Sequence, residues 1–281
     1  TGGGTPAVAS LMRAKLQFTV VSQATNESIW IGLCGVYPAK SKPQIVLTLD
    51  DGFASWYSFI RPLAKHYDIP VSMGIISGSV GNANYLTQAQ IVEMYNDGSR
   101  LFDFVNHSTD NNAYGTIGAA AYYANLVTCR NYLQGIGIYG DGPSHVQYTQ
   151  TQSGDDLYAL MSAGGFLSGR MGSYSYEYAR DQMYATGLDK HRWMLNIAAG
   201  LQTGVSLANA QTAVNTVVAD NGFGMINAHD FASADAAYVW SYDKMEQFFG
   251  WLAAQRDAGT LEVKSWSRWY ADLTGRQSDR R

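Results

Sequence analysis

The feature that most constrains this chain is a regular alternation, from residue 44 onward, of short apolar runs with longer stretches of helical spacing. Strand-like runs cover 45–49, 71–76, 101–105, 144–148 and 224–228. Helical spacing covers 55–66, 87–96, 118–134, 154–163, 206–220 and 244–258. This alternation favours a parallel sheet with helices outside it. In such folds the active site lies where strands end, so the polar residues that end the strands are the candidates for function.

Residues 1–43 follow a different pattern. The runs 16–21 and 29–33 are rich in β-branched and aromatic residues, and a polar turn separates them, which predicts a β-hairpin. A linker with two prolines follows. We therefore divide the chain into an N-terminal extension with a hairpin and linker, 1–43, and a catalytic domain, 44–281. The chain begins without an initiator Met, which we interpret as a processing boundary that leaves targeting information outside it.

Composition excludes several classes of function. The net charge of −4 offers no surface for neutralising phosphates, so we expect no nucleic-acid partner. No run of apolar residues is long enough to span a membrane. Charged residues are 15% of the chain against about 25% in ordinary domains, and Tyr and Gly are abundant, which favours an extracellular, cell-surface or virion-surface location. Two cysteines, Cys34 and Cys129, are too few for a disulfide scaffold, and two free thiols are favoured over one disulfide bridge. The composition leaves open whether the chain forms a homo-oligomer.

Carboxylates end the first strand of the catalytic domain. Asp50 and Asp51 are adjacent, and two neighbouring carboxylates raise one another's pKa unless a cation lies between them. The alternative is that they only cap the helix that follows.

Histidines end two other strands. His107 and Asn111 are four residues apart, so one helical turn would place them on the same face; an ordinary capping segment is the alternative. His229 follows an apolar strand, where a structural histidine is the competing interpretation.

Taken together, these strand ends resemble the polysaccharide deacetylases of the NodB-homology type, carbohydrate esterase family 4. Thr48-Leu49-Asp50-Asp51-Gly52 is similar to the family's Thr-Phe-Asp-Asp-Gly motif. The His-Ser-Thr-Asp-Asn stretch at 107–111 is similar to its His-(Ser/Thr)-x-x-His motif, and the apolar strand 225–229 ends in a histidine as its Leu-x-His motif does. The resemblance covers about 44–273 and includes the helix and Gly-Phe at 155–166.

The resemblance implies a distorted (β/α)7-type barrel that removes N- or O-linked acetyl groups from a polysaccharide. It also implies one bound divalent metal ion, with zinc favoured over other divalent ions. It implies that Asp51, His107 and Asn111 are metal ligands. It also implies a metal-activated water, with Asp50 as general base and His229 as general acid. The chemistry is consistent, because a bound cation lowers the pKa of water towards neutrality and a histidine can protonate the leaving group.

The chain departs from the family pattern at two places. Asn111 stands where a second histidine ligand is expected, and an amide oxygen is a weaker donor that shifts preference away from zinc-like metals. The family's Arg-Pro-Pro motif is absent around residues 146–149, so Arg170 is the candidate, by position, for orienting the base. Tyr148 and Trp193 are further candidates for binding the substrate or orienting the base, and Trp193 could line a sugar pocket. Two alternatives follow: a catalytically degenerate relative that binds glycans, and a metal-independent hydrolase of another C–N bond.

Overall fold

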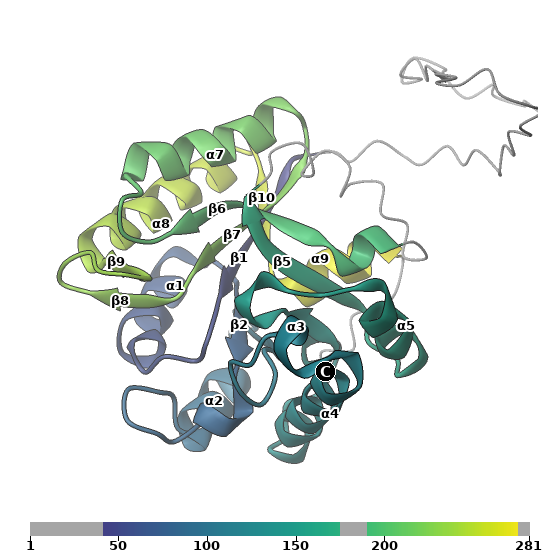
Figure 1. The fold of residues 1–281 in the computed structure, drawn as a ribbon. Helices are drawn as coiled ribbons and strands as arrows, with labels where there is room; N and C mark the ends of the chain where they lie inside the picture. Colours follow the sequence, from purple (N-terminus) through teal and green to yellow (C-terminus); the bar gives the residue numbers. More distant parts are fainter. Residues whose placement is uncertain (1–41, 175–189, 275–281) are drawn as a thin grey trace, which may run out of the picture. The chain divides into compact units, whose positions relative to one another are not determined.

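A closed ring of parallel strands forms the centre of the catalytic domain in the computed structural model, which describes residues 42–174 and 190–274 (Figure 1). The strands of the ring are β1 (Gln44–Leu49), β2 (Val71–Ile75), β3 (Phe102–Asn106), β4 (His145–Gln147), β5 (Ser168–Tyr174), β6 (Leu195–Leu201) and β7 (Phe223–Ala228). They pair in sequence order, and β7 pairs with β1 along its whole length to close the ring. This confirms the predicted (β/α)7-type barrel.

The distortion of the barrel lies beside β1. A short strand, β10 (Glu262–Lys264), pairs with the first half of β1, whereas β2 pairs only with the second half, residues 47–49. The strand β10 therefore enters the ring between β1 and β2 at its N-terminal end. A separate pair, β8 (Asp230–Ala232) and β9 (Val239–Ser241), follows β7.

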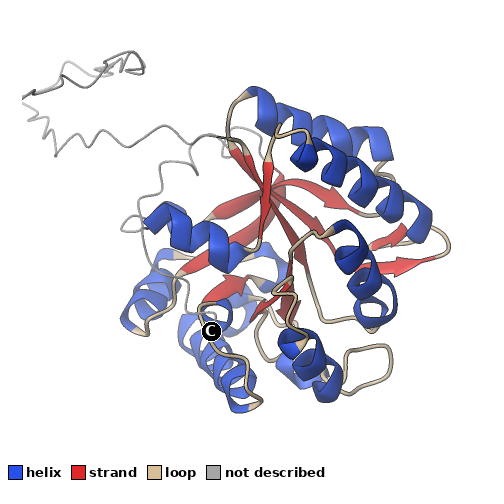
Figure 2. Cartoon of the chain, turned by 180° about the vertical axis from the view of Figure 1, so that it is seen from behind, coloured by secondary structure: helices blue, strands red, loops and turns tan. Residues whose placement is uncertain are grey.

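Helices surround the ring, as the two opposite views in Figures 1 and 2 show. The helices are α1 (Arg61–Tyr67), α2 (Gln88–Asn96), α3 (Tyr114–Ile117), α4 (Ala119–Gly135), α5 (Asp155–Ala163), α7 (Leu207–Ala219), α8 (Tyr242–Asp257) and α9 (Trp266–Thr274). A π-helical turn, Trp56–Ile60, leads into α1. Caps explain where some begin: Thr87 and Gln90 form a reciprocal capping box at α2. None of the described helices has the length and apolar character that crossing a membrane requires.

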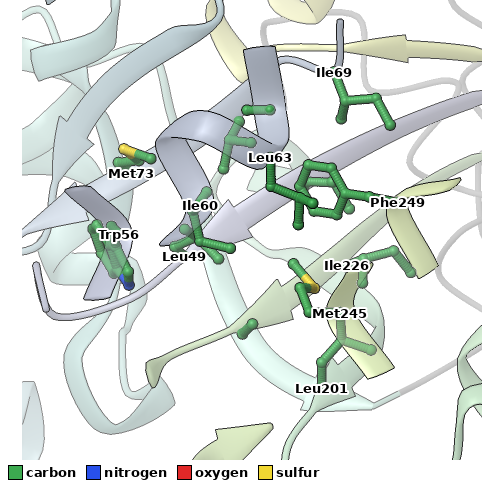
Figure 3. Packing of buried hydrophobic residues seen from close by; sticks show 14 of the residues in the cluster. Leu49, Trp56, Ile60, Leu63, Ile69, Met73, Leu201, Ile226, Met245 and Phe249 are labelled. Atoms are coloured by element: carbon green, nitrogen blue, oxygen red, sulfur yellow. The ribbon is translucent and has the colours of Figure 1, made fainter. Parts of the chain in front are cut away.

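Side chains alternate between the two faces of each barrel strand. On β1, Ile45 and Leu47 face outward into a large cluster that includes Trp56 of the first helical turn (Figure 3). Val46 belongs to a second cluster together with Met225 of β7, inside the ring. Because both faces of these strands are buried, each strand reads in the sequence as a continuous apolar run.

The inward side chains become more polar towards the C-terminal ends of the strands. On β1 the inward series runs Val46, Thr48 and then Asp50, and on β7 it runs from Met225 to Asn227. The Thr48 hydroxyl lies 3.2 Å from the Asn227 side-chain oxygen, to which it donates a hydrogen bond across the β1–β7 pair. An apolar plug thus fills the lower barrel and a buried polar layer forms at its upper edge.

The opposite end of the barrel is closed by α9. Asp103 on β3 accepts hydrogen bonds from the Ser267 backbone N–H and hydroxyl, both at 2.9 Å, and from the Ser72 hydroxyl at 3.3 Å. The backbone N–H of Trp266 donates a hydrogen bond to the Ser72 hydroxyl oxygen at 2.8 Å. This network seats the start of α9 beneath the ring.

The structure differs from the sequence expectations at two strands. Neither β5 nor β6 was predicted, because β5 reads Ser-Gly-Arg-Met-Gly-Ser-Tyr and β6 contains Asn, Gly and two Ala residues, none of which favours a strand. Both are strands because they are held between neighbours in the ring. The predicted hairpin at 16–33 lies outside the described residues, and the division at residue 43 stays a prediction. Cys129 is a free, buried thiol.

Candidate active site

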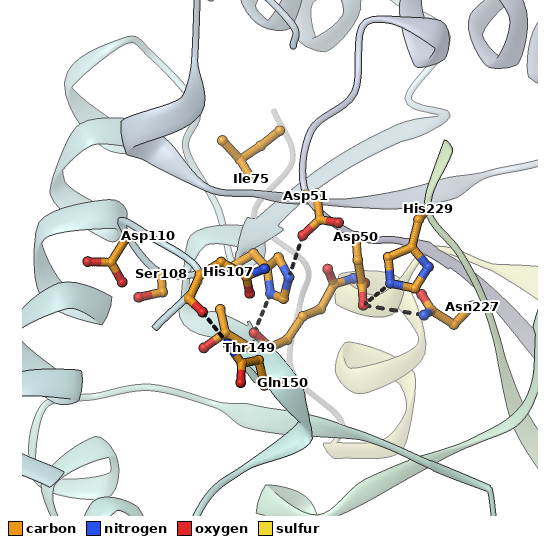
Figure 4. A network of polar contacts seen from close by, with 12 residues as sticks. Asp50, Asp51, Ile75, His107, Ser108, Asp110, Thr149, Gln150, Asn227 and His229 are labelled. Atoms are coloured by element: carbon orange, nitrogen blue, oxygen red, sulfur yellow. Dashed lines mark hydrogen bonds and ion pairs between the residues drawn. The ribbon is translucent and has the colours of Figure 1, made fainter. Parts of the chain in front are cut away.

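The ends of the barrel strands bring the candidate residues together at one edge of the ring (Figure 4). Asp50 and Asp51 follow β1, His107 follows β3, and His229 follows β7. Parallel strands that close into a ring present their carboxyl ends on the same face, so residues far apart in sequence converge there.

Asp50 is almost completely buried, and its carboxylate is held from several sides. Arg170 on β5 donates to its Oδ1 and forms a buried ion pair with it. Asn227 Nδ2 donates to Oδ2 at 3.3 Å. With its amide nitrogen facing Asp50, Gln147 donates to Oδ1 at 2.8 Å and to the Leu49 carbonyl at 3.1 Å. These contacts leave the carboxylate little freedom to rotate.

The charge state of Asp50 follows from these neighbours. Burial raises its pKa, but the positive charge of Arg170 and the nearby imidazoles of His107 and His229 outweigh that effect, so the pKa lies below its usual value. Asp50 is therefore a fixed, ionised carboxylate inside a site from which most solvent is excluded.

His229 lies beside Asp50 and remains partly open to solvent. Its Nε2 is 3.8 Å from Asp50 Oδ2, and its side chain is 21% exposed. Its backbone carbonyl accepts a hydrogen bond from Trp56 Nε1 at 2.7 Å, which ties the residue to the helical turn after β1. Its ring also contacts the ring of Tyr238, with centroids 5.3 Å apart.

Asp51 and His107 form the second pair of the site. Asp51 Oδ1 lies 3.3 Å from His107 Nε2, and His107 Nδ1 lies 2.6 Å from the Gln147 carbonyl oxygen. Since a carbonyl only accepts, Nδ1 carries a proton and Nε2 faces Asp51. Burial lowers the pKa of His107, but the hydrogen bond to Asp51 and the charges of both carboxylates raise it above the usual value.

The turn that presents Asp51 has an uncommon backbone conformation. Asp51 has φ +86° and Gly52 has φ +90°, in the left-handed region that non-glycine residues rarely occupy. Such strain costs about 1–3 kcal/mol and tends to be retained at functional sites. Here it turns the Asp51 side chain towards His107.

Asp51 and His107 fit a divalent cation. Two ligands that bind one ion at about 2.1 Å lie about 3.0–3.4 Å apart, which matches the separation of Asp51 Oδ1 and His107 Nε2. The Gln147 carbonyl fixes the histidine tautomer as second-shell acceptors do at metal sites. Within residues 42–174 and 190–274, no group of three or more His, Cys, Asp or Glu side chains is arranged to hold a metal.

Asn111, the predicted third ligand, lies in the loop after His107. It is exposed, and its backbone carbonyl accepts a hydrogen bond from Gln150 Nε2 at 2.8 Å. No contact within the described part of the chain joins its side chain to Asp51 or His107. Its role as a ligand therefore stays a prediction.

Tyr148 and Trp193 lie in a packed cluster rather than beside the carboxylates. Both are buried, and Trp193 stacks on Tyr158 with ring centroids 6.3 Å apart. Burial raises the pKa of Tyr148 well above its usual value, and its hydroxyl contacts the sulfur of Met161. A sugar would reach either ring only after neighbouring side chains moved.

Sequence reasoning missed two residues that touch Asp50. Gln147 ends β4 and Asn227 lies on β7, two positions before His229. The sequence could have indicated Asn227, because positions 227 and 229 are two residues apart on a strand and their side chains therefore face the same side as the candidate His229. Gln147 had no comparable signal, since its contact depends on how β4 lies relative to β1.

Comparisons with known proteins agree with this fold. Residues 38–167 match the family model for polysaccharide deacetylase. A Mycobacterium smegmatis protein assigned as a polysaccharide deacetylase is similar in structure, with a TM-score of 0.63 and 12% identity over 88% of this chain and 97% of that one. No curated protein sequence matches the chain.

Two other solved structures share the fold. The Bc1960 peptidoglycan N-acetylglucosamine deacetylase has a TM-score of 0.55 at 12% identity, covering 86% of this chain and 92% of that one. The Xyl-CE4 domain of a multidomain xylanase from the hindgut metagenome of Trinervitermes trinervoides has a TM-score of 0.54 at 13% identity, covering 85% and 94%. The family model matches residues 38–167, a little under half of this chain, and makes the chain similar to the polysaccharide deacetylase family of hydrolases.

Proposed function

We propose that this chain removes N- or O-linked acetyl groups from a polysaccharide in a metal-dependent hydrolysis, with Asp50 as general base and His229 as general acid. One observation carries the proposal: an ionised, immobilised carboxylate, Asp50, lies 3.8 Å from a solvent-reachable imidazole and directly beside the Asp51–His107 pair. A base, an acid and a cation-binding pair on one edge of a barrel are what acyl hydrolysis requires.

Asp51 and His107 would hold the cation, with Asn111 supplying an amide oxygen if its loop brings the side chain inward. A divalent cation in such a site lowers the pKa of water and stabilises negative charge on an acetyl oxygen. The buried position of His107 supports this role, because its ring is already oriented by Gln147.

Asp50 accepts a proton from the attacking water. Its lowered pKa keeps it ionised before the reaction. The contacts with Arg170, Asn227 and Gln147 keep the carboxylate in one orientation. A base held in this way loses little entropy on reaching the reactive arrangement.

His229 donates a proton to the leaving group. The water oxygen bonds to the acetyl carbon, the bond from that carbon to the sugar nitrogen or oxygen breaks, and the sugar atom takes the proton from His229. Acetate and the free amine or hydroxyl are the products. The partial exposure of His229 supports this role, because the leaving sugar must approach from the solvent side.

Acetate release from a panel of acetylated polysaccharides, after metal reconstitution, tests the proposal. Wild type should release acetate, and Asp50→Asn, which keeps the shape but cannot accept the proton, should lose activity by about 100-fold or more. Asp68→Asn, an exposed position on the outer surface, is the matched control and should retain full activity. Equal rates for wild type and Asp50→Asn would contradict the assignment of the base.

The exposed Asn111 side chain favours one competing function, a relative that binds glycans without turnover. Asn111→His separates the two. If Asn111 is a ligand, the histidine should tighten metal binding in an equilibrium titration with Zn²⁺, since imidazole is the better donor for zinc. Glycan binding without acetate release, by metal-loaded wild type and Asn111→His alike, would support the competing function.

A further inference from the structure

Tyr238 is a large aromatic side chain left open to solvent beside the active site. It is 63% exposed, and its ring lies against that of His229, with centroids 5.3 Å apart and ring planes 57° apart. The other large apolar side chains exposed in the described ranges are Tyr139, Leu160 and Tyr242, and no contact joins any of them to the site residues. Single exposed aromatic rings are common on protein surfaces, so what distinguishes Tyr238 is its contact with His229 and its backbone conformation.

The backbone at Tyr238 is strained. Its φ is +59°, in the left-handed region, where a bulky residue is an outlier. The Tyr238 carbonyl accepts a hydrogen bond from the Asp230 N–H at 3.2 Å, next to His229 in the sequence. The strain is therefore maintained by a contact that fixes Tyr238 relative to the histidine, which is the arrangement found where strain serves a function.

The loop that carries Tyr238 is also tied down elsewhere. Asp235 forms an ion pair with Lys244 at the start of α8 and accepts a hydrogen bond from the Ser241 N–H at 2.9 Å. Ala236 and Val239 exchange backbone hydrogen bonds, at 2.9 and 3.3 Å. A ring presented by a loop with these restraints loses little freedom when a ligand binds to it.

We propose that Tyr238 is a substrate-binding residue whose ring stacks on the apolar face of the pyranose ring that carries the acetyl group, or of its neighbour. The inference rests on the proposed function. The atom that His229 protonates belongs to the sugar, and a general acid must lie within about 3.2 Å of that atom. The sugar therefore lies on the His229 side of the site, where the Tyr238 ring is open to it.

Other aromatic rings near the site are less suited to this task. Phe53, two residues after Asp51, is stacked on Tyr85 with centroids 5.2 Å apart and planes 18° apart, so that one face of its ring is covered. Tyr148 and Trp193 are buried. Tyr238 combines exposure with contact to a site residue.

Binding and turnover are measured separately to test the inference. Binding is measured by isothermal titration in the Asp50→Asn background, with a β-1,4-linked N-acetylglucosamine pentamer and an acetylated xylopentaose as the probes. For whichever of the two probes binds, Tyr238→Ala should raise the dissociation constant by about 10-fold, whereas Tyr238→Phe, which keeps the ring, should leave it unchanged. Tyr139→Ala is the matched control, because that tyrosine is 65% exposed and lies on the loop after α4.

Turnover gives the second readout. Tyr238→Ala should raise KM on the hydrolysed oligosaccharide with kcat and its pH profile unchanged, as expected when only ground-state binding is lost. A fall in kcat with an altered pH profile and an unchanged binding constant would show that Tyr238 only supports His229, and it would overturn the inference. Failure of the Asp50→Asn protein to bind either probe would overturn it too. Absence of acetate release by wild type, with binding that still depends on Tyr238, would contradict the proposed function alone.

Discussion

At the scale of single residues, the contact with Arg170 determines whether Asp50, the proposed base, is ionised. Arg170 is fully buried on β5, and its guanidinium is the leading charge that lowers the Asp50 pKa against the opposing effect of burial. Without it, burial would dominate, and the carboxyl would hold its proton to higher pH. The ionisation of Asp50 on β1 therefore depends on a side chain supplied by β5.

This gives a first prediction about activity. In Arg170→Met the acid limb of the kcat/KM profile should move to higher pH, because the pKa of Asp50 rises and less base is ionised. Arg170→Lys keeps the charge and should shift the limb less. The measurement is kcat/KM for acetate release as a function of pH for the three proteins, and an identical acid limb in Arg170→Met would contradict the account.

A second prediction concerns stability in chelator-treated protein. Because the folded pKa of Asp50 lies below its unfolded value of about 3.9, its ionised form contributes stability above that pH, and this contribution is lost as pH falls through the folded pKa. Wild type should therefore lose free energy of unfolding more steeply than Asp50→Asn as pH falls below about 4. Urea unfolding at pH 6 and pH 3 provides the measurement, and equal losses would argue against a lowered pKa.

Much of the residue-scale site could be predicted from the sequence, because Asp50, Asp51, His107 and His229 directly follow apolar runs that read as strands. The support around Asp50 could not. Its contact with Gln147 depends on the inward phase and register of a three-residue strand, which no local pattern records.

At the scale of elements, the close approach of neighbouring strands holds the Asp50 carboxylate in place. Gly74 on β2 lies against the Gln147 side chain: a Cβ at that position would be 1.6 Å from the Gln147 amide atom that faces Asp50 and 3.2 Å from the Leu49 carbonyl oxygen. Glycine is needed there because the amide that donates to Asp50 occupies the space of a methyl group.

The third prediction follows from this contact. Gly74→Ala should displace the Gln147 amide, lower kcat/KM by about 10-fold and cost about 1–3 kcal/mol of stability through overpacking. Thr87→Ala is a matched control, since it removes the α2 capping box, costs about 1 kcal/mol and should leave kcat/KM unchanged. Equal kcat/KM for Gly74→Ala and Thr87→Ala would contradict a role for Gln147 in holding the base.

At the same scale, two strands, β5 and β6, could not be predicted from the sequence. The residues of β5 and β6 have low strand propensity, and they form strands because the ring supplies partners on both sides. Arg170 was therefore proposed by position alone, and its approach to Asp50 became visible only with β5 in the ring.

At the scale of the whole domain, the two ends of the barrel have different tasks. The C-terminal ends of the strands carry the strained turn at Asp51 and the buried charges. The N-terminal end is closed by α9 through Asp103, whose carboxylate accepts hydrogen bonds from Ser72 and Ser267. Stability and chemistry are thus placed at opposite ends, as in other α/β barrels.

The fourth prediction tests this separation. Asp103→Ala leaves the Ser267 donors without their acceptor and should lower the free energy of unfolding by about 2–4 kcal/mol. Its kcat/KM below the unfolding temperature should match wild type, because no contact joins Asp103 to Asp50 or His107 among the hydrogen bonds of the described residues. Thermal unfolding and acetate release measured on the same preparation provide the test, and a parallel loss of kcat/KM would contradict the separation.

The most direct test of the central claim is acetate release from an acetylated polysaccharide by wild type and Asp51→Asn, before chelation, after chelation and after stepwise addition of Zn²⁺ or Mn²⁺. The account predicts that chelation abolishes release by wild type and that metal restores it. It also predicts that Asp51→Asn requires a much higher metal concentration, because the carboxylate that faces His107 is gone. Release that survives chelation, or equal metal dependence in the two proteins, would contradict a cation held by Asp51 and His107.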